Sequence, residues 1–124
     1  MRIYFQTTLL CSGFIWVDSS GNEQPAIGNT DIDIKGQVEV ALGFGDFITS
    51  VVGRAGSLID KLQFGLQSGR TVPPCGGIYG DEKDVTPDPW TFGRCFMINI
   101  AGTTNPGINN DLATMQFIWS CQGR

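Results

Sequence analysis

The chain has 124 residues, a net charge of −4 and no histidine, and 16% of its residues are charged. This length suits one domain with a core of its own, which predicts a single domain over residues 1–124. Isolated lysines and arginines in an acidic chain do not form the basic patch of a nucleic-acid-binding protein, and the lack of histidine disfavours zinc sites and ordinary serine or cysteine catalysis.

Residues 1–17 are largely apolar but are interrupted by Gln6, Thr7 and Thr8. They lack the small-x-small cleavage site that ends a secretory signal peptide. No apolar run in the sequence reaches the length of about eighteen residues that a membrane helix needs. We therefore expect no direct membrane span, and the sequence does not decide between a secreted and a cytoplasmic location.

Short strands account for most of the pattern along the chain. Apolar and polar residues alternate in residues 32–35, 37–42, 62–64 and 115–117, which predicts half-buried strands. Residues 47–52 and 96–100 are rich in strand-forming residues, and further strands are expected to end near Leu42 and Phe92. Seventeen glycines and six prolines supply turns between them, and Gly53 and Gly56 argue against a helix over residues 51–62. The chain is predicted to be all-β.

A repeat of about fifty residues relates Phe14, Phe64 and Phe117. The last two each follow an apolar residue and a glutamine, in Leu62-Gln63-Phe64 and Met115-Gln116-Phe117. Residues 47–53 and 96–102 are also related, since each begins with phenylalanine and ends with glycine. The repeated unit is therefore larger than one strand, which indicates one supersecondary unit used several times.

The four cysteines, Cys11, Cys75, Cys95 and Cys121, follow no Cys-x-x-Cys spacing, so we expect no thiolate metal site. They either form two disulfides, with three connectivities open, or remain as four packed thiols. Without a convincing signal peptide, we slightly favour the reduced state. The acidic residues at 81–84 lack the spacing of a calcium loop, so no metal or cofactor is predicted.

Residues 53–64, Gly-Arg-Ala-Gly-Ser-Leu-Ile-Asp-Lys-Leu-Gln-Phe, resemble a motif of the jacalin-related lectins. Members of that family repeat a Gly-x-x-x-Asp loop followed by an apolar strand. The resemblance covers residues 47–80 in detail and most of the chain in outline. It implies a β-prism of three Greek-key-like four-stranded sheets with a pseudo-threefold internal repeat. Three full units need more residues than this chain has, so we expect the prism to be incomplete or permuted.

The same motif predicts where a ligand binds. Gly56 is expected to adopt a positive φ that leaves the Leu58 and Ile59 backbone N–H groups pointing outward, beside the Asp60 carboxylate. A carboxylate beside free amides suits the vicinal hydroxyls of a sugar. The resemblance implies a site for mannose or a related hexose, formed by Gly56, Ser57, Leu58, Ile59, Asp60, Gly76, Gly77 and Tyr79. The alternative is structural: Asp60 caps the turn or pairs with Arg54 or Lys61, and Gly76-Gly77 is an ordinary loop.

The other copies of the motif are less complete. Leu10 occupies the aspartate position in the first copy, so no site is expected there. Ala113 occupies it in the third copy, although Gly107 and Asp111 repeat the Gly-x-x-x-Asp spacing two residues earlier. Gly107 and Asp111 are therefore a weaker second candidate site.

The sequence as a whole predicts a non-catalytic lectin that recognises mannose-type glycans or glycoproteins. The alternative is a degenerate jacalin-like module for protein interaction or membrane targeting within a larger protein, for example a pore-forming one. Because a single monosaccharide site binds weakly, we expect a homo-oligomer, in which linked sites raise the avidity.

Overall fold

The computed structural model describes residues 2–6, 10–17, 20–30, 36–43, 45–108 and 110–123, so the strand predicted at residues 32–35 lies outside the described residues. The described residues form ten strands and one short helix. The strands are β1 (Arg2–Gln6), β2 (Leu10–Ile15), β3 (Ile27–Gly28), β4 (Gly36–Glu39), β5 (Ile48–Ala55), β6 (Ile59–Leu66), β7 (Cys75–Gly76), β8 (Asp81–Asp84), β9 (Cys95–Asn105) and β10 (Asp111–Cys121). The helix is α1 (Pro89–Phe92).

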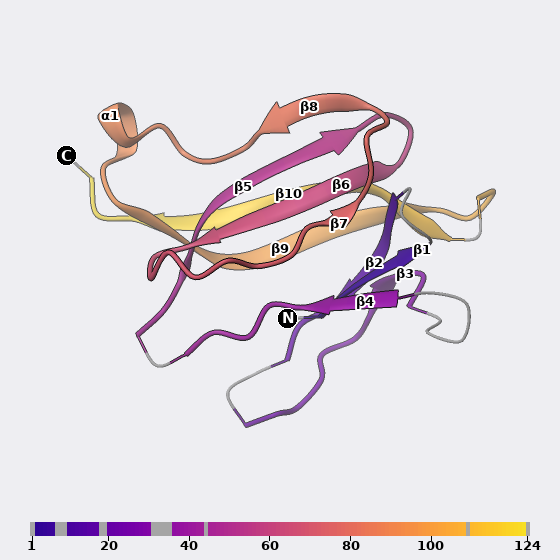
Figure 1. The fold of residues 1–124 in the computed structure, drawn as a ribbon, viewed down its shortest axis with the longest axis horizontal. Helices are drawn as coiled ribbons and strands as arrows, with labels where there is room; N and C mark the ends of the chain where they lie inside the picture. The colour runs from indigo at the N-terminus through magenta and orange to yellow at the C-terminus, as the bar shows by residue number, and fades with distance from the viewer. Residues whose placement is uncertain are drawn as a thin grey trace.

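Two four-stranded antiparallel sheets share one topology (Figure 1). Their strand orders are β3-β2-β1-β4 and β7-β6-β5-β8. Each is a central hairpin flanked by the two strands that follow it in the chain, which is the strand order of a Greek key. Phe14 on β2 and Phe64 on β6 therefore occupy equivalent places, and the sequence repeat is a repeat of this unit.

The third unit is the long hairpin β9–β10, which carries Phe117. Within the described residues this sheet has two strands, so the prism is incomplete in this unit. The strand expected to end near Phe92 is wrong, because α1 occupies its place. Asp88 caps this helix by accepting hydrogen bonds from the Trp90 N–H at 3.0 Å and the Thr91 hydroxyl at 2.9 Å. The strand expected over residues 37–42 is also shorter, since β4 ends at Glu39.

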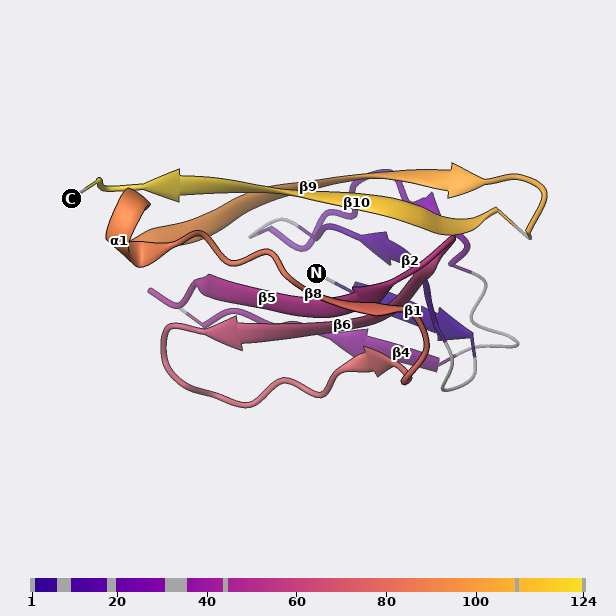
Figure 2. The same cartoon turned by 90° about the horizontal axis from the view of Figure 1, so that it is seen from above.

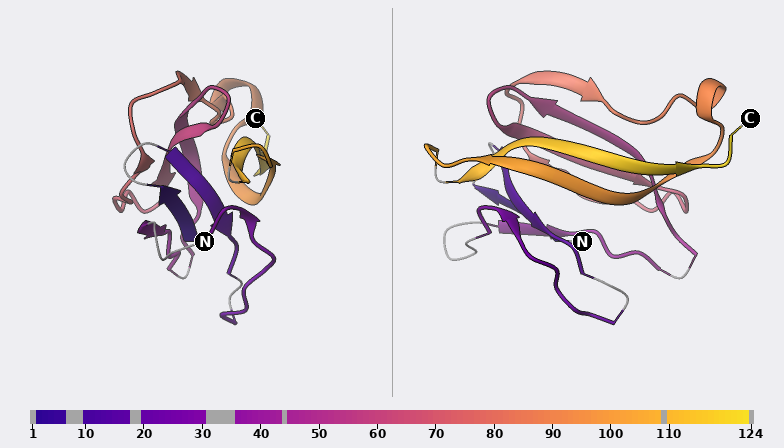
Figure 3. Two further views of the ribbon diagram at one scale, coloured as in Figure 1. Left: turned by 90° about the vertical axis from the view of Figure 1, so that its right-hand side faces the viewer. Right: turned by 180° about the vertical axis from the view of Figure 1, so that it is seen from behind.

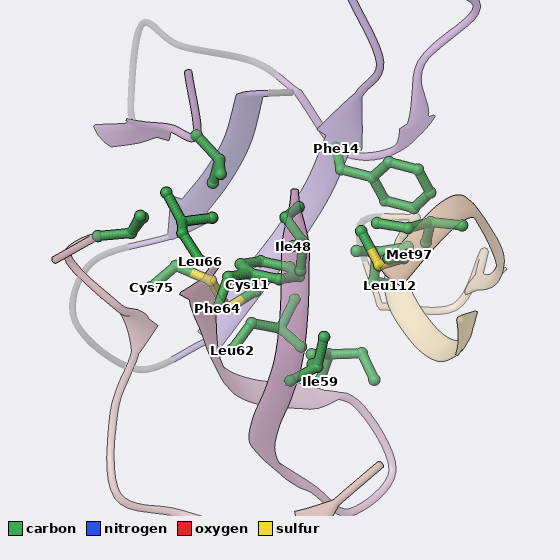
Figure 4. Packing of buried hydrophobic residues seen from close by; sticks show 14 residues of the cluster. Cys11, Phe14, Ile48, Ile59, Leu62, Phe64, Leu66, Cys75, Met97 and Leu112 are labelled. Carbon is green, nitrogen blue, oxygen red and sulfur yellow. A yellow bond between two sulfur atoms is a disulfide. The ribbon is translucent and has the colours of Figure 1, made fainter. Parts of the chain in front are cut away.

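The three sheets pack around one another (Figures 2 and 3), and all three contribute residues to one apolar core. On β6, Leu62 and Phe64 are buried whereas Gln63 between them is exposed, as the alternation predicts. The Phe64 ring meets the Phe117 ring edge to face, with centroids 6.4 Å apart. Figure 4 shows the cluster, which includes Phe14, Ile48, Met97 and Leu112. Each fully buried side chain of this size contributes about 1.5–3 kcal/mol to the free energy of folding.

The preference for reduced cysteines is wrong, because the structure contains two disulfides. Cys11 on β2 is bonded to Cys75 on β7, which ties the first sheet to the second. Cys95 is bonded to Cys121, its register partner at the ends of the β9–β10 hairpin. The fold itself therefore brings each pair within disulfide reach. No helix in the described part of the chain is long and apolar enough to cross a membrane.

Candidate functional site

The turn between β5 and β6 carries the Gly-x-x-x-Asp motif. The Gly56 N–H donates to the Leu58 carbonyl at 3.0 Å, and the β5–β6 register shifts between Arg54 and Ala55. Gly56 does not adopt a positive φ, so that prediction is wrong: the bulge and this short hydrogen bond close the turn without it. Gly56 and Ser57 are exposed. The Leu58 side chain is buried, which leaves only its main chain available to a ligand.

Asp60, the second residue of β6, is half-buried at the mouth of this turn. Partial burial raises the pKa of its carboxyl above the usual value of 3.8, and two groups oppose that rise. They are the Gly56 backbone N–H, which hydrogen-bonds to the carboxylate, and the positive charge of Arg54. Asp60 is thus a surface carboxylate with defined partners on one side.

A second loop, residues 76–80, packs onto Asp60 from the other side. The Gly77 N–H donates to the Asp60 main-chain carbonyl at 2.8 Å. Arg54 Nε and Nη2 donate to the Tyr79 and Gly80 carbonyls at 3.2 and 2.9 Å, so its guanidinium ties β5 to this loop. The candidate site therefore lies where the 56–60 turn and the 76–80 loop meet.

Positive φ angles, predicted for the first loop, occur in the second. Gly76 has a φ of 85° and Gly80 a φ of 78°. A Cβ on Gly80 would collide with the Asp60 carboxylate and would lie 2.9 Å from the Ala55 carbonyl carbon. A Cβ on Gly76 would collide with the Asp60 main-chain carbonyl. Both glycines therefore let the loop approach Asp60 closely.

The structure thus brings the predicted residues of both loops together around Asp60. Tyr79 is 60% exposed beside them, and its main-chain carbonyl, not its ring, accepts the hydrogen bond from Arg54 Nε. Sequence reasoning missed Gly80, although it is the third glycine in a five-residue stretch. It also treated Arg54 as an alternative partner of Asp60, whereas Arg54 both influences Asp60 electrostatically and holds the facing loop.

The second candidate site has a different environment. Asp111 begins β10 and is 1% exposed, so its side chain faces the interior rather than solvent. Gly107 is exposed in the preceding turn, where its N–H donates to Asn105 Oδ1 at 3.0 Å. This burial argues against a second sugar site at Gly107 and Asp111. Among the described residues there is also no cluster of histidine, cysteine, aspartate or glutamate that could hold a metal ion.

Neither a protein-family model nor a curated protein sequence matches the chain. Solved structures do match it. A prostate-specific WGA16 glycoprotein lectin superposes with a TM-score of 0.74 at 15% identity, over 97% of this chain and 79% of that one. The artocarpin–mannotriose complex gives 0.71 at 19% identity, over 96% and 81%. The mannose-binding lectin from champedak gives 0.70 at 19% identity, over 96% and 80%.

These similarities extend over nearly the whole chain at low sequence identity, so they concern the fold. The fold predicted from the sequence, the β-prism of jacalin-related lectins, is confirmed.

Proposed function

We propose that this chain is a lectin that binds mannose-type glycans at the junction of the 56–60 turn and the 76–80 loop, without catalysis. The observation that carries the proposal is the Asp60 carboxylate, half-buried between two loops that Arg54 and the Gly77 N–H hold together. Structural neighbours support the ligand class, since artocarpin forms complexes with mannotriose and methyl-α-mannose.

The chemistry of the site suits a pair of sugar hydroxyls. A carboxylate only accepts hydrogen bonds, so its two oxygens can each take one hydroxyl proton. Such charge-assisted bonds contribute about 1.5–3 kcal/mol each, and two of them correspond to a dissociation constant in the millimolar range. The exposed Tyr79 ring can lie against the apolar C–H groups of the sugar.

A binding role fits this site better than a catalytic one. Glycoside hydrolysis usually needs a pair of carboxyl groups that flank the scissile bond. The groups that act on the Asp60 carboxylate are instead a backbone N–H and a guanidinium. Both favour the ionised carboxylate, which accepts hydrogen bonds, and neither is a carboxylic acid that could protonate a leaving group.

Titration with methyl α-mannoside, followed by calorimetry or NMR, tests the proposal. Asp60→Asn keeps the shape of the side chain but removes the charge, and it is expected to weaken binding by tenfold or more. Glu39→Gln, at an exposed position on β4 of the first sheet, is the matched control and is expected to bind as wild type. A wild-type chain that gives no response to any mannoside, or an Asp60→Asn variant with unchanged affinity, would contradict the proposal.

The comparisons do not favour the alternative of a degenerate interaction or targeting module. A glycan array separates the two functions, since the alternative predicts no saccharide response at all.

A further inference from the structure

A β-bulge in β6 places two consecutive side chains on one face of the second sheet. Asp60 is the extra residue of this bulge, because its neighbours Ile59 and Lys61 pair with consecutive residues of β5. Ile59 and Leu62 are buried, whereas Asp60 and Lys61 between them are half-buried. A regular strand points consecutive side chains to opposite faces, and a bulge re-aims one of them. Asp60 and Lys61 therefore both point to the outer face of the sheet, away from the core.

The outer face beside this bulge carries a polar depression. Strands β8, β5 and β6 lie side by side (Figure 1), and their register places Glu82 next to Arg54 and Arg54 next to Lys61. In the following row, Val52 lies next to Gln63. These five residues line the depression together with Gly53. Gln63 and Glu82 are exposed and the other three are half-buried, so a ligand can reach the depression from solvent.

The depression adjoins the candidate sugar site. Arg54 lines the depression, acts on the Asp60 carboxylate through its charge and donates to the 76–80 loop. Lys61 follows Asp60 directly in the chain and shares its face. The register partner of Lys61 on β7 is Gly76, which has no side chain that could cover this surface. A sugar held at Asp60 therefore has polar surface beside it that continues along β6.

The third unit contains the same bulge without these charged groups. In β10 the extra residue is Ala113, since the residues on either side of it pair with consecutive residues of β9. Ala113 is the repeat equivalent of Asp60, and Thr114 is the equivalent of Lys61. The Thr114 hydroxyl is hydrogen-bonded to the Thr103 hydroxyl, 2.6 Å away. The bulge thus forms without charged side chains, so the architecture alone does not account for Asp60 and Lys61.

The depression offers a sugar ring both kinds of hydrogen-bonding group. The Lys61 ammonium donates, the Glu82 carboxylate accepts, and the Gln63 amide does both. A sugar hydroxyl also donates and accepts, so each of these groups can bind one. Half-buried Val52 adds apolar surface for the C–H groups of the ring. The charged side chains around the depression are of both signs, which suits a neutral sugar better than an acidic one.

We propose that this depression is an extension subsite, which binds the second unit of a mannose-type oligosaccharide while the terminal mannose lies at Asp60. Lys61, Gln63 and Glu82 bind the hydroxyls of the second unit. The subsite rests on the proposed function and deepens it, because it makes the ligand an oligosaccharide rather than a single terminal mannose.

Titration with methyl α-mannoside and with methyl α-dimannosides of different linkage tests the subsite. Wild type is expected to bind at least one dimannoside about fivefold or more tightly than the monosaccharide, since one or two added hydrogen bonds give this gain. In Gln63→Ala the ratio of the two affinities is expected to fall towards one. Gln116→Ala is the matched control, because Gln116 is the exposed repeat equivalent of Gln63 on β10. Its ratio is expected to equal that of wild type.

NMR of wild type supplies a second measurement that does not depend on any variant. The dimannoside is expected to shift the side-chain amide signal of Gln63 and to leave that of Gln116 unchanged, whereas methyl α-mannoside shifts neither. Equal affinities for methyl α-mannoside and every dimannoside, or a wild-type ratio in Gln63→Ala, would overturn the subsite and leave the sugar site at Asp60 in place. A chain that binds no mannoside at all would overturn both.

Discussion

Removing the Cys11–Cys75 disulfide is expected to destabilise the fold and to weaken the candidate site together. The bond joins residues 64 apart in the sequence, whereas Cys95–Cys121 joins residues 26 apart. A cross-link restricts the unfolded chain more when it closes a longer loop, and the loop-closure estimate is about 4 kcal/mol for the first bond and about 3.5 kcal/mol for the second. Cys11 and Cys75 are also 0% and 2% exposed, so their replacement removes packed sulfur from the core.

The Cys11–Cys75 bond has a further role, because Cys75 belongs to the two-residue strand β7. This strand pairs with Lys61 and Leu62 and leads into the 76–80 loop beside Asp60. With the bond removed, β7 loses its covalent link to β2, and the loop is held by non-covalent contacts alone, among them the two-residue pairing of β7 with β6 and the hydrogen bonds with Arg54 and Asp60. We therefore expect weaker sugar binding even under conditions where the variant is folded.

The Cys11→Ala/Cys75→Ala and Cys95→Ser/Cys121→Ser double variants test both effects. Urea unfolding measures their loss of stability, and titration with methyl α-mannoside measures their sugar affinity. Each is expected to lose about 3–4 kcal/mol of unfolding free energy, and only the first is expected to lose sugar affinity while folded. Reductant adds a test on wild type: Cys121 is exposed, so its bond should be reduced first, whereas the buried bond should resist until the chain unfolds. A loss below about 1 kcal/mol from the first variant, or equal reduction rates, would refute this reasoning.

Four further predictions concern the site. Gly80→Ala should abolish sugar binding, because the added Cβ collides with the Asp60 carboxylate. Gly69→Ala is the control: Gly69 has a similar φ of 79° and no atom within 4 Å of the added Cβ, so the change should cost only about 1 kcal/mol of backbone strain and leave binding intact. Calorimetry measures the binding of both variants, and urea unfolding measures their stability. As the pH is lowered, sugar affinity should begin to fall while the pH is still above 3.8, because binding needs ionised Asp60 and the pKa of Asp60 is raised. The raised pKa also means that ionisation of Asp60 opposes folding. The contribution of Asp60 to stability is therefore greatest at low pH and declines as the pH rises. Arg54→Met should move the binding midpoint to higher pH, and an unchanged midpoint would contradict the electrostatic role of Arg54. Tyr79→Ala should weaken binding with little change in melting temperature, since the side chain is 60% exposed; a large loss of stability would indicate a structural role instead.

Much of the fold could be predicted from the sequence because it depends on local periodicity. The alternation around Gln63 indicated which side chains of β6 face the core, and the phenylalanine spacing indicated the repeated hairpin. The helix α1 was missed, although its local signals are present: Asp88 at the cap, Pro89 at the first turn and Gly93 after the end. The prediction of a strand ending near Phe92 did not take these capping residues into account, although they can be recognised in the sequence.

The turn that carries the candidate site was predicted in position but not in conformation. The Gly-x-x-x-Asp pattern located the Asp60 turn, but the φ of Gly56 depends on how the turn closes against β5. The positive φ angles at Gly76 and Gly80 depend on contact with Asp60, which is distant in sequence. The cysteine pairing was open for a similar reason, because it depends on which strands the fold brings together.

The most direct test of the central claim is NMR mapping of backbone amide shifts during titration with methyl α-mannoside. The proposed function predicts that the largest shifts occur within residues 56–60 and 76–80 and that they disappear in Asp60→Asn. Shifts concentrated elsewhere, for example in the 105–111 turn, or shifts that persist unchanged in Asp60→Asn, would contradict a sugar site at Asp60.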